Sequence, residues 1–280
     1  MRLIFHPTCL TYHLPGHPET PRRVRLAWEH LSRQYETVPP EPAGDEDILT
    51  VHTPRHLEMV RTGQFLDWDT PALPFIFDHA LLAAGGALTA MRLALDGVAA
   101  ISLLRPPGHH AGPDSVAGFC YFNNIAIAAA RALEQVDRVA IVDFDCHHGN
   151  GTQDIFLGRD RVVYLSLHQS PFYPGTGLFS ERNCFNYPLR MGADEEMWLR
   201  ALDDGLAKVR AFGPDLIAVS AGFDLYKLDP FSFIPLSHEA FRAAGERIGA
   251  LGRPVFSVLE GGYSDGLGRC AAAYLEGLAG

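Results

Sequence analysis

We predict an α/β fold for this chain, with a single domain over residues 1–280 and a mostly parallel β-sheet that carries helices on both faces. Short apolar runs alternate with amphipathic helical runs from residue 98 onward, which is typical of parallel sheets covered on both sides. The 280 residues are 47% hydrophobic, enough for one large core. No internal repeat, low-complexity tract or linker divides the sequence.

The first third of the chain predicts one strand and several helices. Residues 2–6 form the strand, and Pro21 favours the first position of a helix over residues 21–34. Two short helical segments follow the prolines at 39–42, and the second begins with Thr53 as its N-cap. Residues 63–78 read as irregular surface, and residues 79–95 as a helix whose Gly85-Gly86 pair allows close packing.

The rest of the chain follows a regular alternation. Strands are expected at 98–104, 138–142, 162–167, 216–220 and 255–259, with a possible edge strand at 184–189. Helices are expected at 121–135, briefly near 152, and at 194–210, 238–251 and 267–278.

Charge and cysteine usage exclude several classes of function. Lys and Arg number 23 against 33 Asp and Glu, a net charge of −10, and no basic cluster exceeds residues 21–25, so we expect no nucleic-acid partner. The five cysteines are scattered without a CxxC spacing, which predicts free thiols and a cytoplasmic location. We also expect no membrane partner, because the sequence shows no signal-peptide pattern and no apolar run long enough to span a bilayer.

Residues 140–151 place several metal-binding side chains at the end of an apolar strand. If the extended geometry continues, Asp143, Asp145 and His147 point to one side, and Phe144, Cys146 and His148 to the other. Charged groups gathered in apolar surroundings repel one another unless a cation lies among them, so the stretch predicts a divalent metal. The alternative is a capped turn with solvated polar residues. Cys146 is expected to face the core as a buried thiol.

Polar residues follow four other predicted strands in the same way. His109 and His110 come after the strand at 98–104, Asp224 after 216–220 and Tyr263 after 255–259, while Ser166 and His168 follow Leu165. The carboxyl ends of parallel strands share one edge of a sheet, where ligands bind. Singly, each group also has a structural interpretation as turn, cap or packing residue.

Together these residues suit metal-assisted hydrolysis. Asp145, His147 and Asp224 would supply three ligands and leave positions open, as in catalytic zinc sites. A metal held there would polarise a carbonyl and acidify water.

Acid–base chemistry needs further groups. His109 and His110 are the candidates for a general base, and Tyr263 could donate a hydrogen bond to the oxyanion. Asp143 would orient one of the histidines from behind.

At these positions the sequence resembles the zinc-dependent histone deacetylase family of the arginase–deacetylase superfold, which includes bacterial acetylpolyamine amidohydrolases. The resemblance covers most of the chain, and it rests on segments at 17–23, 105–111, 118–124, 143–151, 166–168, 173–177, 220–224 and 261–263.

The resemblance implies roles for the central residues. Asp145, His147 and Asp224 correspond to zinc ligands, and Tyr263 to the tyrosine that stabilises the transition state. His110 corresponds to the general base and acid. His109 is its electrostatic partner, backed by Asp143.

The same resemblance implies the surroundings of the site. Phe119 and Tyr173 would form walls of an acyl-lysine channel, and the Gly118 carbonyl would accept the substrate amide. Arg23 corresponds to an arginine at the inner end of the channel. Family members also bind a structural potassium ion, which here implies a site at Asp143, Asp145, His147, Ser166 and Leu167.

Members of the family differ in residue type at two of these positions. Asn150 stands where some relatives have aspartate, as in the class II branch, so His110 should be harder to protonate than beside a carboxylate. Phe231, seven residues after Asp224, occupies the place of a rim residue that selects substrates, where an aromatic side chain argues against a dicationic substrate.

We therefore expect one catalytic zinc and an amidohydrolase that removes an acetyl or other small acyl group from an acylated amine. Acyl-lysine in a peptide is the first candidate substrate, and an acetylpolyamine or a small metabolite the alternative. A binuclear manganese ureohydrolase and a non-catalytic acyl-lysine sensor are less favoured hypotheses. Acyl length, oligomeric state and the choice between zinc and Fe(II) stay open.

Overall fold

The computed structural model describes residues 1–280 and contains one eight-stranded sheet in the order β2-β1-β3-β8-β7-β4-β5-β6. Every neighbouring pair of strands is parallel. The sheet is thus fully parallel, which confirms the predicted architecture. The strands are β1 (Arg2–Ile4), β2 (Glu36–Val38), β3 (Ala100–Ser102), β4 (Val139–Asp143), β5 (Val162–Ser170), β6 (Cys184–Arg190), β7 (Leu216–Ala221) and β8 (Val255–Leu259).

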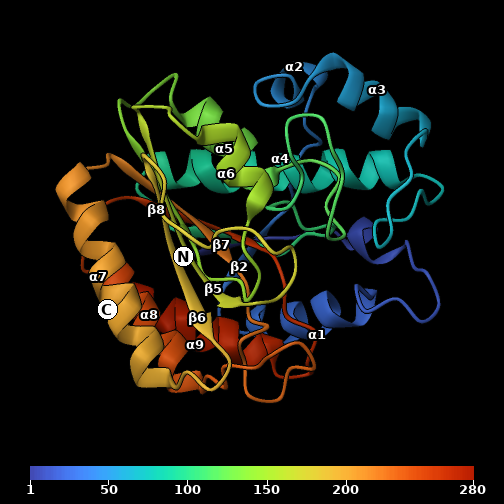
Figure 1. The fold of residues 1–280 in the computed structure, drawn as a ribbon. Helices are drawn as coiled ribbons and strands as arrows, with labels where there is room; N and C mark the ends of the chain where they lie inside the picture. Colours follow the sequence, from blue (N-terminus) through green and yellow to red (C-terminus); the bar gives the residue numbers. More distant parts are fainter.

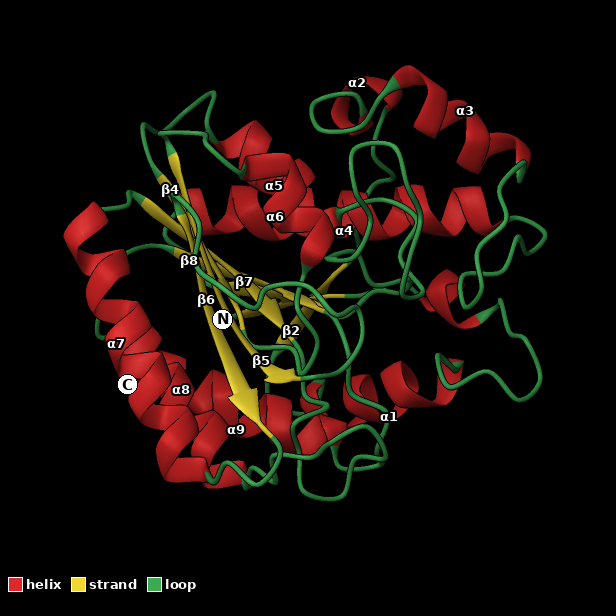
Figure 2. Cartoon of the chain, in the orientation of Figure 1, coloured by secondary structure: helices red, strands yellow, loops and turns green.

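Helices cover both faces of the sheet (Figure 1). One layer contains α4 and α5, with α2, α3 and α6 beside them, and the other contains α1, α7, α8 and α9, as Figure 2 shows in red on the two sides of the yellow strands. The helices are α1 (Pro21–Leu31), α2 (Asp45–Ile48), α3 (Pro54–Thr62), α4 (Ile76–Leu95), α5 (Asn124–Ala132), α6 (Asn150–Phe156), α7 (Glu195–Phe212), α8 (His238–Gly249) and α9 (Leu267–Ala279), with a 3₁₀ turn η1 (Pro7–Leu10) after β1. None of them combines the length and apolar character that a bilayer crossing requires.

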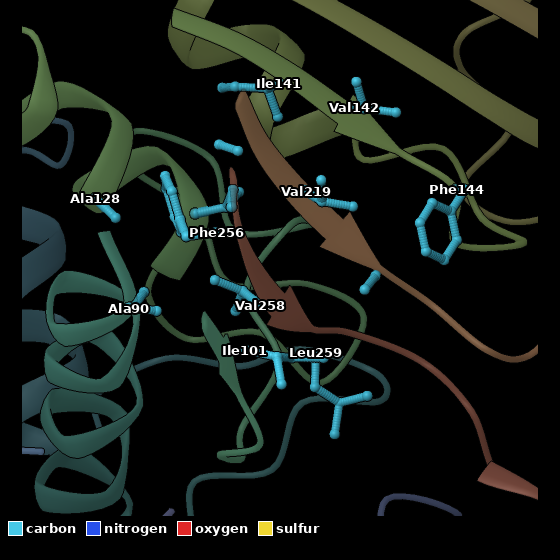
Figure 3. Packing of buried hydrophobic residues seen from close by; sticks show 14 of the residues in the cluster. Ala90, Ile101, Ala128, Ile141, Val142, Phe144, Val219, Phe256, Val258 and Leu259 are labelled. Atoms are coloured by element: carbon cyan, nitrogen blue, oxygen red, sulfur yellow. The ribbon is translucent and has the colours of Figure 1, made fainter. Parts of the chain in front are cut away.

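The core lies on both sides of the central strands. Figure 3 shows Ala90 of α4 and Ala128 of α5 on the same side of the sheet as Phe256 and Val258 of β8, and all four are buried. Small residues on these helices allow close approach: a Cβ on Gly86 would lie 2.2 Å from Leu104 Cδ1. The predicted role of the Gly85-Gly86 pair in close packing is confirmed.

On the opposite face, Phe144 anchors an aromatic cluster. Its ring centroid lies 5.3 Å from that of Tyr274 and 5.9 Å from that of Phe223. Phe144 follows β4 directly, so the packing of this ring fixes the start of the loop that carries Asp145 and His147.

Several element boundaries differ from the sequence prediction. Strand β2 was not predicted; it is a three-residue edge strand with no buried residue, so it lacks an apolar signal. Helix α5 begins at Asn124 instead of residue 121, because the Asn123 side chain accepts the backbone N–H of Ala126 and caps the helix there. Helix α4 begins at Ile76, within the stretch read as irregular.

Candidate active site

The five strands that carry the predicted polar residues are consecutive neighbours in the sheet, in the order β3-β8-β7-β4-β5. Their carboxyl ends therefore meet, and a pocket of about 560 Å³ lies above them. Its lining includes His109, His110, Asp145, His147 and Tyr263. One detail of the prediction is wrong: Ser166 and His168 lie inside β5, because this strand runs on to Ser170 in its pairing with β6.

Asp145 and His147 line this pocket, and Asp224 is buried beside them. His147 Nδ1 lies 3.1 Å from Asp145 Oδ1 and 3.4 Å from Asp224 Oδ2. Both carboxylates are buried, and no Lys or Arg forms an ion pair with either of them. The predicted clustering of these three side chains from two distant loops is confirmed.

The backbone reaches this geometry by a bend instead of a continued strand. Strand β4 ends at Asp143, whose Oδ1 accepts the N–H of Asp145, and Asp145 Oδ1 in turn accepts the N–H of His147. The strict alternation expected from the sequence therefore breaks down at Cys146. Its Sγ lies 3.2 Å from His147 Nδ1, so the prediction that this thiol points away from the site is wrong. It is buried as predicted, and burial raises its pKa well above the usual value.

The donor atoms fit a bound cation. Asp145, Cys146, His147 and Asp224 present ligand atoms within 4.8 Å of one another, and Asp224 Oδ2 is buried without a hydrogen-bond partner. Burial lowers the pKa of His147, but the carboxylates of Asp145 and Asp224 outweigh it and raise this pKa to about 10. A site that attracts a proton this strongly also attracts a metal ion, which competes for the same lone pair.

Glycine is required around the carboxylates. A Cβ on Gly261 would lie 2.1 Å from Asp224 Oδ2, and one on Gly222 would lie 2.3 Å from Asp145 Oδ2. The Gly261 N–H donates to Asp145 Oδ2 at 2.7 Å. The backbone thus approaches the acidic groups as closely as the sequence indicated.

His109 is paired with Asp143, as predicted. Its Nδ1 lies 3.0 Å from Asp143 Oδ2, which also accepts the Tyr164 hydroxyl at 2.9 Å. Burial lowers the pKa of His109, but Asp143 and Asp145 together outweigh that effect and raise it to about 10. The two aspartates thus favour the protonated form of His109.

His110 has the opposite character. Its Nδ1 lies 2.8 Å from Asn150 Oδ1, an atom that can only accept, so Nδ1 carries the proton and Nε2 keeps its lone pair. Burial lowers the pKa of His110, and the charges of His109 and His147 lower it further. The two adjacent histidines, with ring centroids 4.0 Å apart, thus differ in protonation because their partners differ.

Aromatic side chains form the pocket walls. The ring centroid of Tyr263 lies 4.8 Å from that of Phe231 and 6.1 Å from that of Phe119. Tyr173 stands on the other side, 5.1 Å from the His110 ring. Behind Tyr263, the buried Arg23 donates to the Gly262 carbonyl at 2.6 Å and places its guanidinium 5.0 Å from the tyrosine ring.

The segment that the sequence analysis read as irregular surface, residues 63–78, supports one wall of the pocket. Asp69 Oδ1 accepts the Gly118 N–H and Thr70 Oγ1 accepts the Phe119 N–H, both at 3.0 Å. This support lets Phe119 adopt a φ of 69°, a left-handed conformation unusual for a bulky residue. Asp67 and Asp69 also line the pocket. The only sequence signal was a polar cluster in a stretch without period.

Gln169, Asp229 and Glu260 are further buried polar residues that the sequence analysis did not assign. At the end of β5, Gln169 Nε2 donates a hydrogen bond to the Phe231 carbonyl. Gln169 Oε1 accepts the backbone N–H of Phe233. Glu260 Oε2 accepts the N–H groups of Gly108 and His109. Gln169 lies near the end of β5, past the predicted strand end at 167, and Glu260 directly follows β8; these positions were the available sequence signal.

With this geometry in place, comparison with known proteins defines the class. The sequence profile described as histone deacetylase domain matches residues 17–278, so the chain belongs to the histone deacetylase family. It is an amidohydrolase of the deacetylase type.

Similar proteins agree with this assignment. The chain is 41% identical to a probable deacetylase of Methanothermobacter thermautotrophicus over 100% of its own length and 91% of that protein. It is 40% identical to a histone deacetylase-like amidohydrolase of Pseudomonas aeruginosa, covering 94% and 76% of the two chains. Among solved structures, acetylpolyamine aminohydrolase from Burkholderia pseudomallei superposes with a TM-score of 0.94 at 30% identity, over 100% of this chain and 98% of that one.

Proposed function

We propose that this protein is a zinc-dependent amidohydrolase that removes an acetyl or other small acyl group from an amine at the end of a flexible chain. The observation that carries the proposal is one pocket lined by Asp145, His147, His110 and Tyr263, with Asp224 buried against the first two. These groups cover metal binding, proton transfer and oxyanion stabilisation.

Asp145, His147 and Asp224 would hold the zinc ion. When bound, zinc supplies a Lewis acid that polarises the scissile carbonyl and makes water a stronger acid. The mixed nitrogen and oxygen donors suit zinc or Fe(II). Cys146 is left out of this ligand set, because a buried thiol of raised pKa releases its proton less readily than the carboxylates.

His110 would transfer the protons. Its Nε2 lone pair accepts a proton from the attacking water, and the same atom later donates that proton to the departing amine. His109, held positive by Asp143, and the neutral Asn150 keep His110 in its basic form between turnovers. Tyr263 would donate a hydrogen bond to the carbonyl oxygen as its negative charge develops.

The pocket walls support an acylated amine as substrate. Phe119, Tyr173 and Phe231 flank the approach to the site, which suits a slender alkyl chain. Neither Lys nor Arg lines the pocket, which disfavours anionic substrates and tolerates the ammonium group of the product. We propose that the Gly118 carbonyl accepts the substrate amide.

An acetylpolyamine is the second candidate substrate. Asp67 and Asp69 in the pocket lining favour it, because carboxylates attract the remaining ammonium groups of such a molecule. Phe231 favours the first candidate, acyl-lysine, because an aromatic side chain at this position offers no charge to a second cation.

A potassium ion near Asp143 and Ser166 is also part of the proposal. The two residues are register partners on β4 and β5, and both are buried, as is Leu167. Oxygen-rich surroundings of this kind suit a hard monovalent cation.

Two substitutions test the mechanism. Tyr263→Phe and His110→Ala should each lower kcat on an acetyl-lysine fluorogenic peptide by at least about a hundredfold, because each removes a proton-transfer or oxyanion group. Rates close to wild type in both variants would contradict the mechanism.

Metal analysis and a substrate panel complete the test. The expected content is one zinc ion per chain, whereas two ions would favour the binuclear ureohydrolase. A panel of acetyl-lysine peptides, longer acyl-lysine peptides and acetylpolyamines identifies the substrate class. Binding of these compounds by the zinc-loaded protein without any turnover would favour the sensor hypothesis.

A further inference from the structure

Asp229 is a buried carboxylate that lies outside the catalytic set but touches two of its elements. It is 6% exposed and forms no ion pair with Lys or Arg. Its Oδ2 accepts the backbone N–H of Tyr263 at 2.6 Å and that of Ser264 at 2.9 Å. Its Oδ1 accepts the backbone N–H of Phe231 at 3.1 Å. One side chain thus joins the loop after β7 to the loop after β8.

The two loops meet at the pocket wall. The Phe231 and Tyr263 rings stand 4.8 Å apart at an interplanar angle of 67°, so a shift of either backbone moves the other ring. On its far side, Phe231 is fixed by Gln169, which donates to the Phe231 carbonyl at 2.9 Å. No other side chain accepts the N–H groups of Tyr263 and Ser264.

The chemistry of this position requires a carboxylate. Three N–H groups converge on two oxygens, and an amide offers only one oxygen, so asparagine would place its NH₂ group against at least one N–H. The three backbone N–H groups favour the charged form of Asp229, which burial and the nearby Asp224 disfavour.

We propose that Asp229 is a positioning residue that sets the backbone of Tyr263 against that of Phe231. This proposal rests on the proposed role of Tyr263 in catalysis. Asp229 itself touches neither substrate nor metal in this scheme. It acts on turnover through Tyr263, and on substrate binding through Phe231.

A double-mutant cycle tests the link to Tyr263. Asp229→Asn should lower kcat about tenfold in the wild-type background but less than about twofold in the Tyr263→Phe background, because a misplaced hydroxyl matters only where a hydroxyl exists. KM should rise in both backgrounds, since Phe231 is displaced in both. Kinetics on the acetyl-lysine peptide with zinc-loaded protein provide both parameters.

Asp215→Asn is the matched control. Asp215 also accepts two backbone N–H groups on one oxygen, those of Asp137 and Arg138, but it lies at the opposite end of the strands. It should change kcat by the same factor in both backgrounds. Equal factors for Asp229→Asn in both backgrounds would overturn the proposal.

Two further measurements distinguish a folding defect in a variant from a failure of the proposed catalytic mechanism. Thermal unfolding by circular dichroism checks each variant, and Asp229→Glu, which keeps the charge, replaces Asp229→Asn in the same cycle if the latter does not fold. A wild-type rate in Tyr263→Phe alone would contradict the proposed function. A normal loss there with no coupling to Asp229 would contradict only the positioning role.

Discussion

The protonation of His110 depends on its burial and on the residues beside it. Its Nδ1–H donates to the Asn150 oxygen, which carries no charge, while the adjacent His109 faces the carboxylate of Asp143. Burial lowers the pKa of His110, and the neighbouring His109 lowers it further. These surroundings favour the neutral, basic form of His110.

Asn150→Asp should move the acidic limb of the activity profile to higher pH. The added negative charge favours protonated His110 and raises its pKa, so kcat/KM begins to fall at a higher pH when the solution is acidified. A pH profile of kcat/KM measures the shift. Gln34→Glu, which adds a charge at an exposed position beyond α1, is the control and should leave the profile in place. A downward shift, or none, would contradict this role of Asn150.

The proposed ligand set predicts different effects for neighbouring residues. His147→Ala should abolish stoichiometric zinc binding, because it removes the nitrogen ligand between two carboxylates. Cys146→Ala should keep about one zinc per chain, although its Sγ lies only 3.2 Å from His147. Zinc content after dialysis measures both. Zinc loss in Cys146→Ala would assign the thiol to the ligand set.

Among single residues, those that could be predicted from the sequence are polar side chains that come shortly after a strand. Asp145, His147 and Asp224 could be predicted because each comes shortly after an apolar run and belongs to a residue type that binds metals. Asp229 could not, since its role lies in backbone N–H groups 34 and 35 residues away. The direction of Cys146 was missed because the strand ends three residues earlier, at Asp143.

Among the elements, long buried strands were predictable and short edge elements were not. Strands β4, β7 and β8 are apolar runs buried over their whole length, and their predicted positions are within one residue of those observed. Strand β2 has three residues and no buried side chain, so its pairing with β1 comes from the tertiary structure. The extension of β5 to Ser170 likewise depends on its partner β6.

A substitution at Gly261, in the loop after β8, tests whether the backbone must approach the carboxylates of Asp145 and Asp224 closely. Gly261→Ala should abolish zinc binding and activity, because its Cβ would lie 2.1 Å from Asp224 Oδ2 and 2.5 Å from Asp145 Oδ2. Gly97→Ala is the control: its Cβ meets no atom within 4 Å, and the positive φ of 80° costs about 1–2 kcal/mol of stability. Zinc content and thermal unfolding distinguish the two. Normal zinc binding in Gly261→Ala would contradict the close approach.

Across the whole molecule, one buried ionic network connects the N-terminal segment to the sheet edge that bears the site. Glu19 accepts hydrogen bonds from Arg105 Nε at 2.7 Å, from Arg23 Nη1 at 3.2 Å and from the Tyr12 hydroxyl at 2.9 Å. Arg105 follows β3, and Arg23 reaches the Gly262 carbonyl beside Tyr263. Glu19 is 3% exposed, so these bonds replace its entire hydration.

Glu19→Gln should destabilise the protein by about 3–5 kcal/mol at pH 7, because it leaves two buried guanidinium groups short of a counter-charge. Burial raises the pKa of Glu19, but Arg105 and Arg23 outweigh it, so the folded-state pKa is lowered. A lowered pKa stabilises the fold above the unfolded value of about 4.3 and loses this contribution as the pH falls through the folded value. The difference in Tm between wild type and Glu19→Gln should therefore be full at pH 7 and narrow below about pH 4. Glu58→Gln, which removes an exposed partner of Arg61, should change Tm little at either pH. A Tm difference that stays constant down to pH 3 would show that packing, rather than the charge of Glu19, joins the N-terminal segment to the sheet.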